Sequence, residues 1–144
     1  MDKFVSASEN ETKKIAYKLA STLKTGDVIV LSGDLGAGKT LFAKGLLSFW
    51  ELENEVSSPT FTIVNEYSAA TIPSPTHIYH FDVYRLSGSE EFCAIGGPEY
   101  FENGISIIEW GEIIESILPQ NHIKITFEKD LADDTTRHIT ISNM

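Results

Sequence analysis

The feature that most constrains this chain is the segment Gly33-Asp34-Leu35-Gly36-Ala37-Gly38-Lys39-Thr40, which matches the phosphate-loop pattern G-x-x-x-x-G-K-[ST] at every fixed position. The preceding residues, 28–31, are β-branched or aliphatic, as in a strand buried on both faces. The following residues, 41–50, place apolar side chains at helical spacing. This order of strand, turn and helix argues against a glycine-rich turn that matches by chance. The segment therefore predicts binding of a nucleoside triphosphate.

The loop residues have distinct expected roles. Its glycines let successive backbone N–H groups point at a phosphate, and the helix N-terminus adds partial positive charge. Lys39 is expected to reach the β- and γ-phosphates, and the Thr40 hydroxyl to take one position on a magnesium ion. The predicted nucleotide-binding residues are Asp34, Leu35, Gly36, Ala37, Gly38, Lys39, Thr40 and Leu41.

Two further segments are apolar strands that end in a carboxylate, namely 77–82 with Asp82 and 105–109 with Glu109. Ligands bind at the carboxyl ends of strands in open α/β sheets, so both acids are expected beside the phosphate loop. One acid would hold magnesium and the other would orient or deprotonate the attacking water. We predict Lys39, Asp82 and Glu109 as catalytic residues. The alternative is that either acid only caps the helix that follows it.

The remaining pattern predicts an α/β fold over a single domain, residues 1–144. We expect a P-loop NTPase-like three-layer sandwich with a mostly parallel central sheet and antiparallel C-terminal edge strands. The other expected elements are an edge strand at 3–8, a helix at 12–23 after a polar capping stretch, a strand at 61–67, an N-capped helix at 87–93, a helical turn at 98–101, a helix at 113–118 and a hairpin of 122–128 with 137–142.

Several single residues have two interpretations. Arg85 is expected to pair with an acid or touch a phosphate, or else to form an ordinary surface ion pair. Trp110 fits packing against a nucleotide or partner, or a place at the edge of the core. The hydroxyl-rich loop 56–60 fits a γ-phosphate sensor or an ordinary polar connection. Cys93, the only cysteine, is expected to be a buried small residue and excludes an intrachain disulfide.

Charge and hydropathy limit the partners. The net charge is −10, and residues 87–144 carry eleven acids against three bases. Such a surface repels phosphate backbones, so tight unaided binding of RNA or DNA is not expected. The acids suit either a basic protein partner or a merely solubilising role. With no apolar stretch resembling a signal peptide or membrane span, we expect no membrane association and a cytoplasmic location.

Four segments together resemble one protein family. They are the phosphate loop, Ser58-Pro59-Thr60-Phe61, His80-Phe81-Asp82-Val83-Tyr84-Arg85-Leu86 and Ile108-Glu109-Trp110-Gly111-Glu112. At this spacing in a chain this short, they resemble the TsaE (YjeE-like) ATPases of bacterial tRNA threonylcarbamoyladenosine (t6A) synthesis. The chain departs from the family at Leu41, where many members have a hydroxyl residue, and at Gly111, where proline is frequent. Residues 91–98 match loosely.

The resemblance implies an ATPase that uses ATP and Mg²⁺, is weak when alone and acts with the TsaD and TsaB proteins to support repeated modification of tRNA position 37. It implies contact with tRNA only through that complex. By this resemblance, Lys39 contacts phosphate, and Thr40 and Glu109 belong to the magnesium site. Asp82 lies at the same catalytic edge of the sheet as Glu109. It also suggests a switch-like loop around Thr60, an aromatic beside the site in Trp110 and an approach to adenine around Asn10.

Two other functions use phosphate loops of this form. One is a small-molecule kinase, which usually needs a lid with several arginines, whereas this chain has only Arg85 and Arg137. The other is a free-standing switch whose slow hydrolysis times an interaction. Weak turnover that rises with partners favours the TsaE reading, and fast turnover with a metabolite acceptor favours the kinase.

Overall fold

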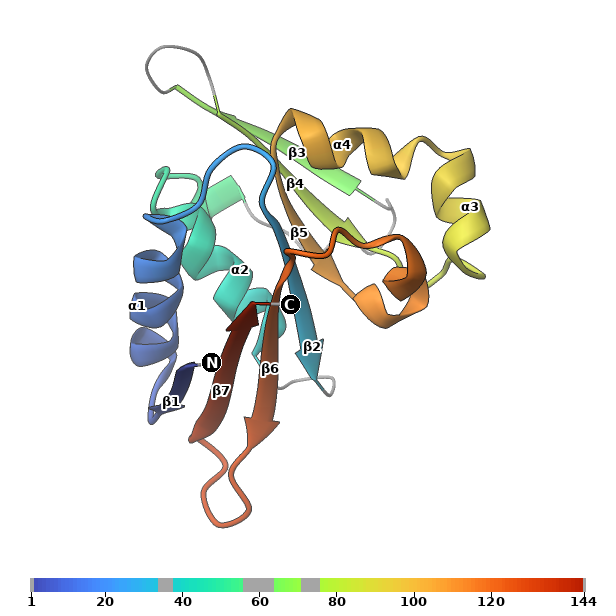
Figure 1. Ribbon diagram of the computed structural model, residues 1–144. Coiled ribbons are helices and arrows are strands. Elements are labelled where there is room, and N and C mark those ends of the chain that lie inside the picture. The colour runs from blue at the N-terminus through green and yellow to red at the C-terminus, as the bar shows by residue number, and fades with distance from the viewer. Residues whose placement is uncertain (1, 34–37, 56–63, 71–75, 144) are drawn as a thin grey trace.

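The computed structural model describes residues 2–33, 38–55, 64–70 and 76–143. These residues form one seven-stranded sheet in the order β1-β7-β6-β2-β5-β4-β3, with helices on both faces (Figure 1). The elements are β1 (Asp2–Ser6), α1 (Glu9–Ala20), β2 (Val28–Gly33), α2 (Lys39–Ser48), η1 (Glu53–Glu55), β3 (Val64–Ala69), β4 (Thr76–Asp82), α3 (Ser89–Ala94), α4 (Gly97–Asn103), β5 (Ile105–Glu109), η2 (Gly111–Ile117), β6 (Ile123–Lys129) and β7 (Arg137–Asn143).

The centre of the sheet is parallel. Strand β2 pairs in parallel with β5 and β6, and β4 pairs in parallel with β5. Antiparallel strands flank this centre, with β3 beside β4, β7 beside β6 and β1 beside β7. The predicted α/β class with a mostly parallel sheet and antiparallel C-terminal strands is confirmed. The structure adds that β6 belongs to the parallel centre and that the N-terminal strand β1 lies outside the hairpin.

Alternation along β2 explains the three layers. Ile29 and Leu31 point into one hydrophobic core, while Val28 and Val30 point into another on the opposite face. Helices α1 and α2 cover the first core, and α3, α4 and η2 cover the second (Figure 1). All four of these strand residues are buried. A continuous apolar run is therefore required here, because both faces of β2 are covered.

Helix α1 begins earlier than the sequence pattern indicates. It starts at Glu9 instead of residue 12 and ends at Ala20 instead of residue 23. Ser8 is the N-cap residue, and its side chain accepts a hydrogen bond from the Glu11 backbone N–H. The Glu11 carboxylate in turn accepts from the Ala7 N–H at 2.6 Å. This reciprocal capping fixes the path of the chain from β1 into α1.

The second layer of helices differs in detail from expectation. Helix α3 begins at Ser89 after Gly88, which has no side chain to cap it, so the expected capping is wrong. The expected helix at 113–118 is a 3₁₀ segment, η2. Cys93 is exposed, because Phe92 takes the buried position of the short helix α3. Within the described ranges, no helix is long and apolar enough to cross a membrane.

Candidate functional site

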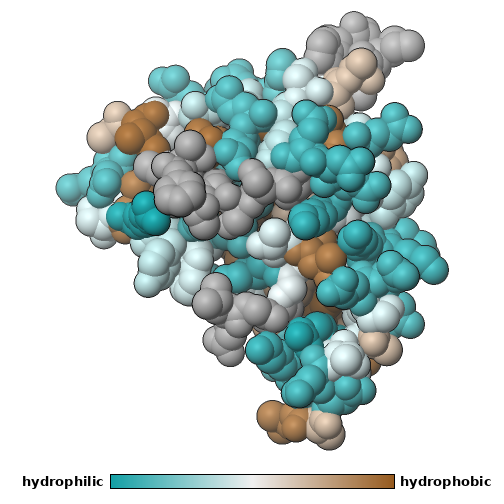
Figure 2. All heavy atoms as spheres, turned by 180° about the vertical axis from the view of Figure 1, so that it is seen from behind, coloured by the Kyte–Doolittle hydropathy of each residue, from teal (hydrophilic) through white to brown (hydrophobic). Residues whose placement is uncertain are grey.

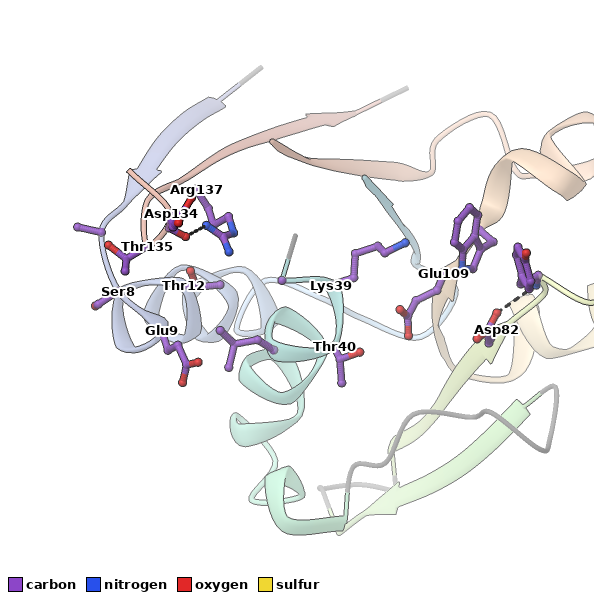
Figure 3. A pocket seen from close by; sticks show the side chains of 15 residues that line it. Ser8, Glu9, Thr12, Lys39, Thr40, Asp82, Glu109, Asp134, Thr135 and Arg137 are labelled. Carbon is purple, nitrogen blue, oxygen red and sulfur yellow. Dashed lines mark hydrogen bonds between the residues drawn. The ribbon is translucent and has the colours of Figure 1, made fainter. Parts of the chain in front are cut away.

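A pocket of about 990 Å³ opens where the parallel strands end and α2 begins. We divide its lining into two groups. In Figure 3 residues of one group lie at one side, Asp82 and Glu109 of the other group lie at the opposite side, and Lys39 and Thr40 lie between them. We call residues 38–41, Asp82, Tyr84, Glu109 and Trp110 the sheet end of the pocket. We call Ala7, Ser8, Glu9, Thr12, Asp134, Thr135 and Arg137 the hairpin end. Side chains from β4, β5, α1, α2 and the β6–β7 connection thus face one space.

The start of α2 forms the floor of the sheet end. Gly38 precedes the helix with φ +107°, a left-handed conformation that glycine adopts without strain, and its carbonyl accepts from the Phe42 N–H at 2.9 Å. Gly38, Lys39, Thr40 and Leu41 all line the pocket. The predicted nucleotide-binding residues Asp34, Leu35, Gly36 and Ala37 lie outside the described residues. Thr60 and the loop 56–60 also lie outside them.

The two predicted acids meet at this end. Asp82 and Glu109 are direct neighbours in the parallel register of β4 and β5, and both line the pocket with Lys39 (Figure 3). The helix-capping alternative is wrong for both, because Gly88 and Trp110 occupy the N-cap positions of α3 and η2. Asp82 instead accepts a hydrogen bond from the Tyr84 N–H at 3.0 Å.

Glu109 has a partner that sequence reasoning did not assign. His80 Nε2 lies 2.7 Å from Glu109 Oε2, with the His80 side chain fully buried. Glu109 itself is only 6% exposed. Within the described part of the chain, His80 Nδ1 has no hydrogen-bond partner. The signal in the sequence is the spacing His80-x-Asp82, which places both side chains on one face of β4.

Trp110 lies at the edge of the core, as one of its two interpretations predicts, and its contact with a nucleotide or partner stays a prediction. It packs against the second hydrophobic core and also lines the pocket. The Lys39 ammonium lies over the Trp110 ring, 4.2 Å from its centroid, and the Tyr84 ring lies 4.8 Å from Trp110. Trp110 has φ +66°, an uncommon conformation for an aromatic residue. Among the described residues of the sheet end, one ammonium group thus lies against an aromatic ring in a pocket that two carboxylates also line.

The hairpin end is formed by segments from both ends of the sequence. Ser8, Glu9 and Thr12 come from the start of α1, Asp134 and Thr135 from the β6–β7 connection, and Arg137 from the start of β7 (Figure 3). Arg137 Nη1 donates to the backbone carbonyls of Asp134 and Thr136.

Two residues from the sequence analysis lie elsewhere. Asn10 is exposed, and the described pocket lining contains its neighbours Ser8, Glu9 and Thr12 instead. Arg85 is exposed and also lies outside that lining, so the arginine at the described pocket is Arg137. The sequence did not predict Arg137 at the pocket, because this residue is far along the chain from the phosphate loop. Only the topology of the sheet brings Arg137 to the pocket.

Hydrogen bonds order the hairpin loop that carries Asp134 and Thr135. The His138 ring, at 2.7 Å, and the backbone N–H groups of Ala132 and Asp133 donate to Asp130. These bonds, that from His138 first, hold the pKa of Asp130 below its usual range. The pKa of Asp133 is lowered in the same way, chiefly by the Thr135 backbone N–H.

The side chains of the sheet end suit magnesium in their chemistry. Among the described residues, no group of three or more His, Cys, Asp or Glu side chains could hold a metal ion. Magnesium usually keeps several waters and binds through one or two carboxylates together with substrate phosphates, so it does not need such a group. Thr40, Asp82 and Glu109 offer hard oxygen donors at one end of the pocket, which is the chemistry that magnesium prefers.

Comparison with known proteins decides the family. A model of the family described as "Threonylcarbamoyl adenosine biosynthesis protein TsaE" matches residues 6–139. The chain belongs to the TsaE family. This match confirms the resemblance to the TsaE family that the sequence motifs indicate.

Individual relatives agree in sequence and in structure. The tRNA threonylcarbamoyladenosine biosynthesis protein TsaE of Bacillus subtilis (strain 168) is 41% identical over 97% of this chain and 84% of its own length. The protein of the same name from Treponema pallidum (strain Nichols) is 37% identical over 96% of this chain and 98% of its own length. The crystal structure of Bacillus subtilis YdiB superposes with a TM-score of 0.71 at 35% identity, covering 99% of this chain and 84% of that one. Both the family and its fold thus extend over nearly the whole chain.

Proposed function

We propose that this chain is the ATP-hydrolysing subunit required for t6A modification at position 37 of tRNA in the cytoplasm, acting with TsaD and TsaB to support repeated turnover. Membership in the TsaE family supports the pathway. One observation supports the proposed ATP hydrolysis above all: Lys39, Asp82 and Glu109 line the same pocket at the carboxyl edge of the sheet. A cation, two acids and a helix N-terminus are the parts that phosphoryl transfer to water needs.

ATP would lie along the pocket with its phosphates at the sheet end. The proposed nucleotide-binding set is residues 34–41, whose backbone N–H groups and helix N-terminus would receive the phosphates. Lys39 would move from the Trp110 ring to the β- and γ-phosphates, where it would make charge-assisted hydrogen bonds. The nucleoside would extend toward Ser8, Thr12 and Arg137 at the hairpin end.

The two acids would divide the work. Thr40 and Glu109 would hold magnesium, and Asp82 would orient the attacking water and accept its proton. Magnesium, when bound, neutralises the charge on the β- and γ-phosphate oxygens. The water oxygen bonds to the γ-phosphorus while the bond from that phosphorus to the β–γ bridging oxygen breaks. ADP leaves with the electron pair, and inorganic phosphate is the second product.

The charge of the chain supports an indirect route to tRNA. The net charge is −10, and the excess of acid lies in the C-terminal part. Figure 2 shows one face of the molecule covered largely by hydrophilic residues, with hydrophobic residues in small groups. An acidic surface repels a phosphate backbone at any distance shorter than the screening length. We therefore propose that TsaD and TsaB make the tRNA contacts.

The experiment is ATP hydrolysis by the purified chain with and without magnesium, first alone and then with TsaD, TsaB and tRNA, together with analysis of modified nucleosides. We expect weak turnover alone, a rise with the partners, and t6A formation beyond one equivalent only when this chain is present. ATP binding without any effect on t6A would contradict the pathway. Fast turnover with a metabolite acceptor would instead support a kinase.

A further inference from the structure

His80 is the buried titratable side chain that the proposed function leaves unused. It lies on β4, opposite Ile107 of β5, and its ring reaches diagonally to Glu109, two residues further along β5. The ring is fully buried and the Glu109 side chain is 8% exposed. Burying a polar ring beside a carboxylate is unfavourable unless the two are hydrogen-bonded, and here they are, at 2.7 Å.

The direction of this bond follows from the chemistry of the two groups. A carboxylate that ligates a metal is ionised and has only acceptor atoms, so in the proposed magnesium site His80 Nε2 would donate the proton between the two groups. The bond engages one carboxylate oxygen, Oε2, of a side chain that also lines the pocket. It restricts the side-chain torsions of Glu109 at the end of β5.

We propose that His80 is a positioning residue, which holds the Glu109 carboxylate in the orientation that receives the magnesium–ATP complex. This inference rests on the proposed function, in which Glu109 belongs to the magnesium site. Hydrogen bonds to metal-ligating carboxylates orient them, and their loss typically lowers metal affinity about 10- to 100-fold. Asp82, on the same face of β4, hydrogen-bonds the Tyr84 backbone instead, so the two acids are held by separate partners.

The geometry separates this role from a purely structural one. His80 lies on the same face of the sheet as Ile78, Ile105 and Ile107, which belong to the first hydrophobic core. An apolar residue of similar size would pack well there if packing were the only requirement. A residue that acts only through packing would leave the magnesium dependence of nucleotide binding unchanged.

The test measures the affinity of a fluorescent, non-hydrolysable ATP analogue as a function of Mg²⁺ concentration and again in EDTA. The variants are His80→Leu, which removes the donor, and His80→Gln, whose amide N–H lies near the position of Nε2. His77→Leu is the matched control, because His77 is exposed on the same strand and points to the other face. Thermal unfolding of each variant establishes that it is folded.

We expect His80→Leu to need about 10- to 100-fold more Mg²⁺ than the wild type to reach the same analogue affinity. Its affinity in EDTA should equal that of the wild type. His80→Gln should recover most of the loss, and His77→Leu should show none. A folded His80→Leu with wild-type magnesium dependence, or equal deficits in the Leu and Gln variants, would overturn the proposal.

Two further measurements keep the result decisive. Glu109→Gln identifies a failure of the proposed function itself: if it retains wild-type magnesium dependence, Glu109 is not a metal ligand and both proposals fall. If Glu109→Gln loses that dependence but His80→Leu does not, only the role of His80 falls. Nitrogen-15 spectra of the wild-type histidines decide the matter if His80→Leu does not fold. A His80 ring protonated at Nε2 that shifts on magnesium–nucleotide binding supports the proposal, and a ring protonated only at Nδ1 overturns it.

Discussion

The two ends of the pocket are built in different ways. At the sheet end, Lys39 and Glu109 are each 6% exposed, and each is fixed by a neighbour, Trp110 for the lysine and His80 for the acid. At the hairpin end, Ser8, Glu9, Asp134 and Thr135 are exposed, and Thr12 is the buried side chain among its described residues. The sheet end holds charges in a place with little water, where electrostatic interactions are strong. The hairpin end presents polar groups to solvent, where each contact is weak.

This difference predicts that the chemical step takes place at the sheet end and that the hairpin end adjusts only the affinity for the ligand. Parallel pairing places Asp82 and Glu109 side by side, so any fold with this register brings both acids to one point. The hairpin end depends on the β1–α1 junction and the β6–β7 connection, held by hydrogen bonds of the Ser8 cap and of Asp130. Substitutions at the sheet end should therefore remove activity, and those at the hairpin end should only change affinity.

The largest effect is expected from Lys39→Ala. Lys39 is the only cation among the described residues of the sheet end, and hydrogen bonds of charged groups contribute about 1.5–3 kcal/mol each. We expect no measurable ATP hydrolysis and a loss of about 100-fold or more in ATP affinity, measured by calorimetry. Lys44→Ala, on the same helix but outside the described pocket lining, is the control and should behave as the wild type. Unchanged ATPase activity of Lys39→Ala would refute the phosphate-loop assignment.

The next largest effect is expected from Glu109→Gln. Glutamine preserves an oxygen that can accept from His80 Nε2 but removes the charge, so the protein should fold as the wild type does. We expect kcat for ATP hydrolysis to fall about 100-fold, since a charged group at a reacting centre typically contributes on that order. Glu115→Gln, exposed on the following segment, serves as the control. Wild-type turnover of Glu109→Gln would remove this acid from the site.

Residues 28–33 and 105–109 illustrate why the sheet end could be predicted from sequence. The first begins with an apolar run and leads into the phosphate loop, and the second is a mostly apolar run that ends in the acid Glu109. Both therefore predict buried strands that deliver functional groups to the same edge of the sheet. The parallel centre of the sheet followed from the same runs. These runs do not reveal which residue is hydrogen-bonded to each acid. His80 and Glu109 are 29 positions apart in the sequence and meet only through the β4–β5 register.

The hairpin end was not predictable in the same way. One interpretation of Arg85, which is close in sequence to Asp82, places it at an acid or a phosphate, whereas the structure brings Arg137 to the described pocket. The reason is that β7 lies between β6 and β1 in the sheet, and its first residue, Arg137, pairs with Ser6 just before α1. The sequence pattern predicts capping before this helix, and Ser8 provides it, although residues 9–11 belong to the helix itself. The nearness of Ser8 to the hairpin depends on sheet order, which no local pattern determines.

A moderate effect is expected from Arg137→Ala. Arg137 is partly exposed, and exposed charge pairs contribute about 0.2–1 kcal/mol, so ATP affinity should fall about two- to five-fold with kcat nearly unchanged. The loss should shrink at high salt. Arg85→Ala is the matched comparison, because it removes the same charge outside the described pocket lining and should leave ATP affinity unaltered. A larger effect from Arg85 than from Arg137 would reverse the assignment of the two arginines.

The smallest effect concerns pH and the hairpin loop. The pKa of Asp130 lies below its ordinary value of 3.8 in the folded protein, chiefly because His138 donates to the carboxylate. A lowered folded pKa means that the carboxylate stabilises the fold above pH 3.8 and that this contribution is lost as pH falls through the folded pKa. Carbon-13 titration of the Asp130 carboxyl should give a midpoint below 3.8, and His138→Ala should raise it toward that value.

At neutral pH the His138→Ala variant should change ATP affinity by no more than about two-fold, because the pair is exposed and orders only the loop behind the hairpin end. A fall in kcat for His138→Ala as large as that for Glu109→Gln would show that the hairpin end takes part in the chemistry, and the division between the two ends would then be wrong.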